Sequence, residues 1–196
     1  MTWPLEHPAK TSDLRLEQRE SALVATIDDP ATRNAMSDAL LGDFEVLFSQ
    51  LRDEPAIRAL VLRGSDRVFC AGADLGGRTL RGSTADAHAA TVELSLRGAR
   101  VYNALSMGLA ACADIVLAGP GASFALSEAR LGLVAAQIAP FVVARLGLAT
   151  TRRLALTGSR FNAEQATNLG LVDELLPDRA ELDARLDAIL GEIQSC

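Results

Sequence analysis

The first apolar segments of the chain predict a pair of strands. Residues 14–17 alternate apolar and charged side chains, whereas residues 22–27 are almost continuously apolar. Both patterns are typical of strands, the second of one that is well buried. The polar residues around 19–21 predict a turn between them, and Asp28-Asp29-Pro30 predicts the end of the second strand.

A helix and a third strand are expected next. Ser37 is a good helix N-cap and Pro55 marks the far side of the helix. The apolar residues between them recur at helical spacing: Leu40, Leu41, Phe44, Leu47, Phe48 and Leu51. The run 57–63 predicts a central strand, because residues 59–62 are apolar without alternation, as in strands buried on both faces. A strand-helix-strand unit favours a right-handed crossover and parallel pairing.

The second half of the chain predicts mainly helices with short strands between them. Asn162 and Gln165 have the spacing of a capping box at the start of one of these helices. The predicted helices are 84–106, 107–113, 138–146, 150–156, 162–170 and one from Arg179, and the predicted strands are 115–118 and 171–176. A short apolar stretch at 123–125 precedes Glu128. No linker divides the chain, so we expect a loose leader at 1–11 and a single α/β domain over 12–196.

Composition excludes several functional classes. The chain has 196 residues, a formal net charge of −6, 49% hydrophobic and 22% charged residues. These values favour a globular protein that binds neither nucleic acid nor an anionic membrane. Neither the three cysteines nor the two histidines have metal-ligand spacing, so we expect no metal. With no signal peptide or long apolar stretch, we expect a reduced, cytoplasmic protein.

A candidate functional segment follows the third predicted strand, in residues 65–75. The residues Cys70-Ala71-Gly72-Ala73 are all small where the backbone is expected to turn, and Asp74 follows. Small residues let a ligand approach the main chain, and successive N–H groups in such a turn can hold an anion or a polarised carbonyl oxygen. The segment is therefore a candidate oxyanion hole, although an ordinary exit from a strand has the same composition.

Five segments follow one another within residues 12 to about 176, namely 29–36, 69–75, 107–115, 124–132 and 156–172. Together, and in this order, they resemble the crotonase superfamily, the enoyl-CoA hydratases and isomerases. The resemblance implies a spiral of stacked ββα units and an acyl-CoA thioester as substrate, with no other cofactor. It also implies a homotrimer or a hexamer of two trimers.

The resemblance assigns roles to several residues. The backbone N–H of Ala73 would polarise the thioester oxygen, and residues 71–75, among them Ala71, Asp74 and Leu75, would line the CoA moiety. Asp74 is expected to fix the turn. Arg33, before Asn34 and Ala35, lies where the family often has a basic residue near the CoA phosphates; an exposed surface arginine would fit the same position.

Glu128 is the candidate acid and base. It lies in the motif where hydratases and isomerases carry a catalytic glutamate, although a surface or helix-capping glutamate is the ordinary alternative. Gly108 stands where hydratases with two glutamates have the second acid, so this chain departs from that pattern. The run 128–143 is similar to that of methylglutaconyl-CoA and isohexenylglutaconyl-CoA hydratases. Gly108 would line the substrate site.

Three activities are compatible with these residues. The first is hydration of a branched enoyl-CoA, with Glu128 as acid and base. The second is isomerisation of an enoyl-CoA double bond between the Δ3 and Δ2 positions by the same single glutamate. The third is binding of acyl-CoA without turnover.

At two positions the chain is shorter than members of the family. Members carry a strand and a glycine cluster, which supplies the second oxyanion donor, between helices corresponding to 99–106 and 107–113, but here Ser106 and Met107 adjoin. We therefore expect about 15–20 residues to be missing from the sequence at this join. The helical region after Cys196 is also expected to be incomplete, with Leu186, Ile189 and Ile193 covered by a further segment or a partner subunit.

Overall fold

The chain divides into two units, each described by itself: residues 1–79 with 189–196, and residues 80–188. The computed structural model describes residues 13–65, 68–72, 107–126, 128–131, 134–136 and 138–196. The predicted leader, the predicted helix over 84–106 and the join at Ser106 lie outside these residues. The prediction of one domain over 12–196 stays a prediction.

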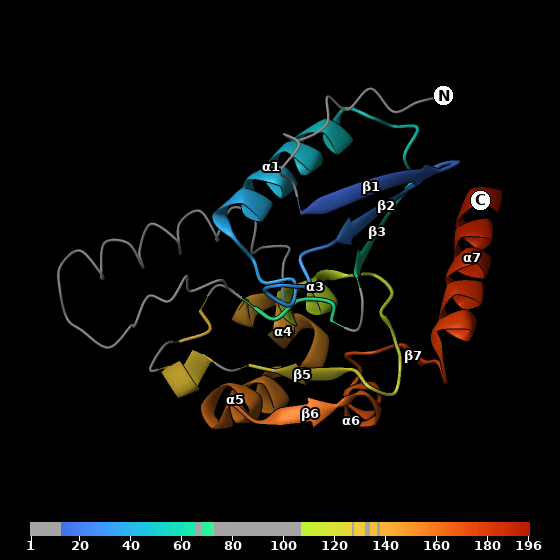
Figure 1. Ribbon diagram of the computed structural model, residues 1–196. Coiled ribbons are helices and arrows are strands. Elements are labelled where there is room, and N and C mark those ends of the chain that lie inside the picture. The colour runs from blue at the N-terminus through green and yellow to red at the C-terminus, as the bar shows by residue number, and fades with distance from the viewer. Residues whose placement is uncertain (1–12, 66–67, 73–106, 127, 132–133, 137) are drawn as a thin grey trace. The chain divides into compact units, whose positions relative to one another are not determined.

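The first unit contains a three-stranded sheet in the order β1-β2-β3 (Figure 1). The strands are β1 (Leu14–Arg19), β2 (Ala22–Ile27) and β3 (Ala59–Gly64). Strands β1 and β2 pair antiparallel with Arg19 opposite Ala22, so the predicted hairpin is confirmed. Strands β2 and β3 pair parallel with Ala22 opposite Ala59, as the strand-helix-strand pattern predicted.

Helix α1 (Asp38–Arg52) connects β2 to β3 and confirms the predicted helix. The Ser37 hydroxyl oxygen accepts the N–H of Leu40 at 3.1 Å, which satisfies one of the free donors at the helix N-terminus. The apolar stripe is buried at Leu40, Leu41, Phe44 and Leu47. Figure 1 shows α1 running alongside the sheet.

The prediction that the 57–63 strand is buried on both faces is wrong, whereas its central place in the sheet stays a prediction. Every residue of β3 is half-buried, and among the described residues β3 pairs with β2 alone. The middle one of the three described strands is β2, of which five of six residues are buried. An apolar run indicates a strand but does not give its burial, because half-buried strands also carry apolar residues.

The second unit contains short helices and strands. Its helical elements are α3 (Met107–Cys112), the 3₁₀ turn η1 (Glu128–Leu131), α4 (Ala139–Leu146), α5 (Leu148–Thr157) and α6 (Ala163–Asn168). Its strands are β4 (Leu117–Ala118), β5 (Ser123–Ala125), β6 (Arg160–Asn162) and β7 (Glu174–Leu175). Strands β4 and β7 pair parallel, and β5 and β6 pair antiparallel.

The core of this unit collects apolar side chains from nearly all its elements. The rings of Phe124 and Phe161 stack across the β5-β6 pair, with centroids 5.8 Å apart. The buried members of the core are Met107, Ala118, Leu126, Ile138, Val142, Leu146, Leu154, Phe161, Ala166, Leu171 and Val172. Because the same core holds β5 and the helices around η1, it positions the turn that begins at Glu128.

Local sequence signals at the ends of these helices are confirmed. Asn162 and Gln165 form the predicted capping box: each side chain accepts the other residue's backbone N–H, at 2.9 and 3.0 Å. Gly147 separates α4 from α5. The predicted strand over 115–118 is shorter than expected, because Ile115 is 47% exposed and only Leu117 and Ala118 pair.

Helix α7 (Arg179–Ser195) ends the chain. Ile189 and Leu190 are buried, whereas Leu186 and Ile193 are half-buried. Of the three side chains expected to need cover, Ile189 is thus already buried within this chain. A further covering segment or subunit stays a prediction.

Candidate functional site

The backbone folds sharply where β3 ends. A Cβ atom added to Gly64 would lie 2.1 Å from the carbonyl oxygen of Val68 and 2.5 Å from Cα of Phe69. Both are backbone atoms, so no side-chain rotation could relieve the clash. Glycine at this position therefore lets the segment 68–72 turn back close against the strand end.

The predicted oxyanion loop continues through Cys70 to Gly72. The N–H of Gly72 donates to Cys70 Sγ at 3.3 Å, so this donor is already engaged within the turn. Burial raises the pKa of the Cys70 thiol, and the bond from Gly72 offsets part of that rise. The thiol is therefore a neutral acceptor that shapes the loop. Ala71 is exposed, whereas Ala73, Asp74 and Leu75 lie outside the described residues.

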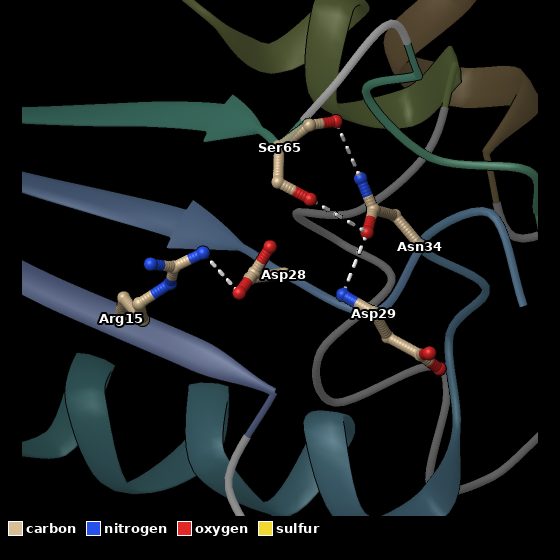
Figure 2. Close-up of polar contacts among 5 residues, drawn as sticks. All are labelled: Arg15, Asp28, Asp29, Asn34 and Ser65. Atoms are coloured by element: carbon tan, nitrogen blue, oxygen red, sulfur yellow. Dashed lines mark hydrogen bonds and ion pairs between the residues drawn. The ribbon is translucent and has the colours of Figure 1, made fainter. Parts of the chain in front are cut away.

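A second loop, residues 28–36, is tied to the first. Arg33 and Asn34 both have positive φ, 61° and 59°. The Arg33 residue is exposed, which suits a phosphate contact and a plain surface arginine alike, and Ala35 is half-buried. The side chain of Asn34 points inward: its residue is 1% exposed. Figure 2 shows it between Asp29 and Ser65.

Four hydrogen bonds engage the Asn34 amide. Its Oδ1 accepts the N–H of Asp29 at 2.8 Å and the hydroxyl of Ser65 at 3.5 Å. Its Nδ2 donates to the carbonyl oxygens of Ser65 and Val68, at 3.3 and 2.6 Å. Two residues further on, the N–H of Met36 donates to the carbonyl of Gly72 at 2.8 Å. From the sequence, Asn34 was named only as the neighbour of Arg33. An asparagine in the turn that begins at Asp29-Pro30 is the signal that could have found it, since asparagine tolerates positive φ.

Acidic residues surround the start of this second loop. Burial, followed by the charges of Asp29, Asp43 and Asp28, raises the pKa of Asp13. Arg15 forms an ion pair with Asp28 (Figure 2). Negative charge on this side would repel CoA phosphates, so any phosphate contact by Arg33 has to work against it.

In the second unit, Glu128 is the first residue of η1 and is half-buried. Leu126, two residues before Glu128, is 1% exposed. Two residues after Glu128, the Arg130 side chain donates from Nε to the carbonyl of Gly158 at 2.9 Å. Arg130 also packs over this glycine, whose φ is +56°. The turn that carries Glu128 is thus fixed at both ends, by the core and by the C-terminus of α5.

Gly108 is the second residue of α3, in a helix with no acidic residue in its first turn. The described residues of α3 therefore supply no second carboxylate of the kind that two-glutamate hydratases use. Among the described residues there is also no group of three or more histidine, cysteine, aspartate or glutamate side chains that could hold a metal ion. None of the described helices is both long and apolar enough to span a membrane.

The chain matches the family model described as enoyl-CoA hydratase/isomerase in two stretches, residues 17–104 and 103–193. Solved structures agree. Pseudomonas aeruginosa AtuE superposes with a TM-score of 0.85 at 37% identity, covering 94% of this chain and 78% of that one. An enoyl-CoA hydratase/isomerase from Marinobacter aquaeolei superposes with a TM-score of 0.83 at 34% identity, covering 94% and 78%. The chain belongs to the enoyl-CoA hydratase/isomerase family and has the crotonase fold.

Curated relatives include both hydratases and an isomerase. A Rhodobacter capsulatus protein named "Probable enoyl-CoA hydratase" is 30% identical over 179 residues, covering 84% of this chain and 69% of the relative. The 1,2-epoxyphenylacetyl-CoA isomerase of Escherichia coli is 29% identical, covering 85% and 72%. The mevalonyl-coenzyme A hydratase of Beauveria bassiana is 29% identical over 201 residues, covering 91% and 71%. The chain is therefore similar to enzymes of both reaction types.

Proposed function

We propose that this protein adds water across the α,β double bond of a branched enoyl-CoA. The observation that carries the proposal is Glu128, half-buried at the start of a turn that Leu126 and Arg130 fix in place. A carboxylate held in this way can move protons without losing geometry. The similarity of residues 128–143 to the branched-chain hydratases supports a branched acyl group.

The reaction needs one acid-base group and a donor for the thioester oxygen. Glu128 takes a proton from water as the water oxygen bonds to the β carbon. The electrons of the double bond move onto the thioester oxygen, where the N–H of Ala73 stabilises the negative charge. Glu128 then returns its proton to the α carbon. The engagement of the Gly72 N–H by Cys70 supports Ala73 as this donor.

CoA binding is assigned to residues around the two loops of the first unit. We propose that Ala35, Ala71, Asp74 and Leu75 line the CoA moiety, with Gly108 beside the acyl thioester. Arg33 would contact a phosphate. The exposure of Arg33 and Ala71 supports their access to a ligand.

An isomerase is the second candidate. Isomerisation needs one group that removes a proton from one carbon and returns it to another, so a single glutamate suffices. Gly108 supports this candidate because it has no carboxylate. A similar E. coli protein is named 1,2-epoxyphenylacetyl-CoA isomerase, which supports an isomerisation of a CoA thioester in general rather than the double-bond shift itself.

A panel of enoyl-CoA substrates in ¹⁸O-labelled water separates the candidates. Hydration predicts loss of the conjugated thioester absorbance and one ¹⁸O atom in the product. Isomerisation predicts a shifted double bond with no ¹⁸O. Tight binding of acyl-CoA with no turnover across straight and branched substrates would instead show an inactive relative.

We also propose that the natural polypeptide has about 15–20 further residues between Ser106 and Met107. The family model matches in two stretches that meet at residues 103–104, next to this join. The alignment with the Beauveria relative runs over 201 residues although this chain has 196, so that relative has residues that this chain lacks. The half-buried edge of β3 is also where another strand would pair. An intact mass of 20.7 kDa with a continuous peptide through the join would refute this proposal.

Assembly and compartment complete the proposal. We propose a homotrimer or a hexamer of two trimers in a reduced, cytoplasmic setting. None of the three cysteines, all of which lie in the described part of the chain, forms a disulfide, which supports that setting. Light scattering of the purified protein measures the mass of the assembly.

A further inference from the structure

The Asn34 amide donates hydrogen bonds to two carbonyl groups that lie just beyond the end of β3. Ser65 and Val68 follow β3, and the Asn34 Nδ2 atom donates to the carbonyl oxygens of both, at 3.3 and 2.6 Å. The side chain is buried, with Oδ1 occupied by the N–H of Asp29. A buried amide with all these partners costs little to desolvate, but each partner would lose a hydrogen bond if the amide were removed.

The same short segment also holds the far end of the loop. The Met36 N–H donates to the Gly72 carbonyl at 2.8 Å. In a trans peptide unit, the carbonyl of one residue and the N–H of the next lie in one plane and point in opposite directions. A contact that fixes the Gly72 carbonyl therefore fixes the direction of the N–H that follows it. That N–H belongs to Ala73.

We propose that Asn34 is a positioning residue for the oxyanion donor. Its side chain fixes the start of the loop at Ser65 and Val68, while the backbone two residues later fixes the loop's end at Gly72. The loop is thereby held before substrate binds. Preorganised donors stabilise a developing oxyanion because no reorganisation is needed during the reaction. This inference rests on the proposed function, since it gives Asn34 a role in a reaction at the thioester.

The backbone of Asn34 allows a clean test. Its φ is 59°, a conformation that glycine adopts freely and alanine does not. Asn34→Gly therefore removes the four hydrogen bonds of the amide without adding backbone strain. Asn34→Asp keeps the acceptor for Asp29 but turns an acidic oxygen toward two carbonyls. Glu20→Gly is the matched control, because Glu20 is exposed in the β1-β2 turn and also has positive φ, 52°.

Three measurements are made at a temperature where all variants are folded. Steady-state kinetics use the best enoyl-CoA of the panel. Binding uses acetoacetyl-CoA, whose enolate places negative charge on the thioester oxygen, and free CoA as the reference ligand. Hydrogen exchange follows the amides of the peptide containing residues 65–73.

We expect kcat to fall about 10- to 100-fold in Asn34→Gly and at least as much in Asn34→Asp, because small misplacements of a catalytic group cost about this much. KM and the affinity for free CoA change less than about threefold, whereas acetoacetyl-CoA binds at least about tenfold more weakly. Amides at 68–72 exchange faster. Glu20→Gly changes none of these values.

Two results would overturn the proposal: unchanged exchange at 68–72 in Asn34→Gly, or equal losses of acetoacetyl-CoA and free CoA binding. Failure of the proposed function has a different signature. If the unsubstituted protein turns over no enoyl-CoA, the proposed reaction is rejected. Exchange and the two binding measurements still decide whether Asn34 positions the loop donor.

Discussion

Arg145 on α4 and Asp173, just before β7, form an ion pair with Nη2 2.6 Å from Oδ2. The same carboxylate oxygen accepts the N–H of Val116 at 2.7 Å. The rest of the guanidinium donates to the carbonyls of Ala113 and Gly170, at 2.7 and 3.1 Å. One arginine thus joins the segments before β4, after α6 and before β7.

We expect Arg145→Lys to destabilise the protein by about 1–3 kcal/mol, because an ammonium group cannot serve three acceptors in these directions. Urea unfolding measures the change. Arg152→Lys is the control, since Arg152 is exposed on the next helix, and it should stay within about 0.5 kcal/mol. Equal effects of the two substitutions would contradict the structural role of Arg145.

Glu128→Gln should lower kcat by about 10²- to 10⁴-fold, because glutamine keeps the shape of the side chain but cannot transfer the proton. The melting temperature should barely change, since Glu128 is half-buried and lies outside the apolar core of its unit. Glu45→Gln, at an exposed position of α1, serves as the control and should keep full activity. A Glu128→Gln enzyme with nearly full kcat would remove Glu128 from the mechanism.

Gly64→Ala and Gly42→Ala should have opposite effects on stability. A Cβ at Gly64 meets backbone atoms at 2.1 and 2.5 Å, so we expect a loss of about 1–3 kcal/mol. A Cβ at Gly42, inside α1, meets nothing within 4 Å, so we expect a gain of about 0.5–1 kcal/mol. Denaturant midpoints compare the pair. A neutral Gly64→Ala would mean that the loop after β3 is not packed against the strand end.

The Glu174–Arg185 pair should make stability depend on pH. Hydrogen bonds from the Arg185 guanidinium hold the pKa of Glu174 below its ordinary value of 4.5. A carboxyl with a lowered pKa in the folded state contributes stability above its unfolded pKa and loses it as pH falls through the folded pKa. Glu174→Gln should therefore be less stable than the unsubstituted protein at pH 7.

The difference between the two proteins should shrink as the pH is lowered from 4.5 through the folded pKa of Glu174. Thermal melts from pH 7 to pH 3 follow it. A difference that stays constant over this range would show that the carboxylate charge contributes nothing. Because both side chains are about one-third exposed, added salt should also weaken the effect.

The elements that the sequence predicted well are those with local causes. The β1-β2 turn, the Ser37 cap and the Asn162–Gln165 capping box each depend on residues a few positions apart. Strand β6 was missed because three residues, Arg160 to Asn162, carry no readable period. The place of β3 in its sheet also depends on pairing with distant residues, which a single run of apolar side chains does not encode.

The candidate site divides in the same way. The motif around Glu128 and the small residues of 70–72 were found from the sequence, and the family they implied is confirmed by the comparisons. The role of Asn34 was not found. Its partners Ser65 and Val68 lie 31 and 34 positions away, so only the folded backbone brings them to the amide.

That separation also has a kinetic consequence. The β1 and β2 strands are joined by the two-residue turn Glu20-Ser21, so this hairpin closes a very short loop. The bonds from Asn34 to the carbonyls of Ser65 and Val68 join the segment after β2 to the segment after β3, so we expect them to form after these strands have paired. We therefore expect them to be absent from the folding transition state, so that Asn34→Gly speeds unfolding and leaves the refolding rate almost unchanged. On this expectation the hairpin governs the refolding rate of the first unit, whereas Asn34 governs its unfolding rate.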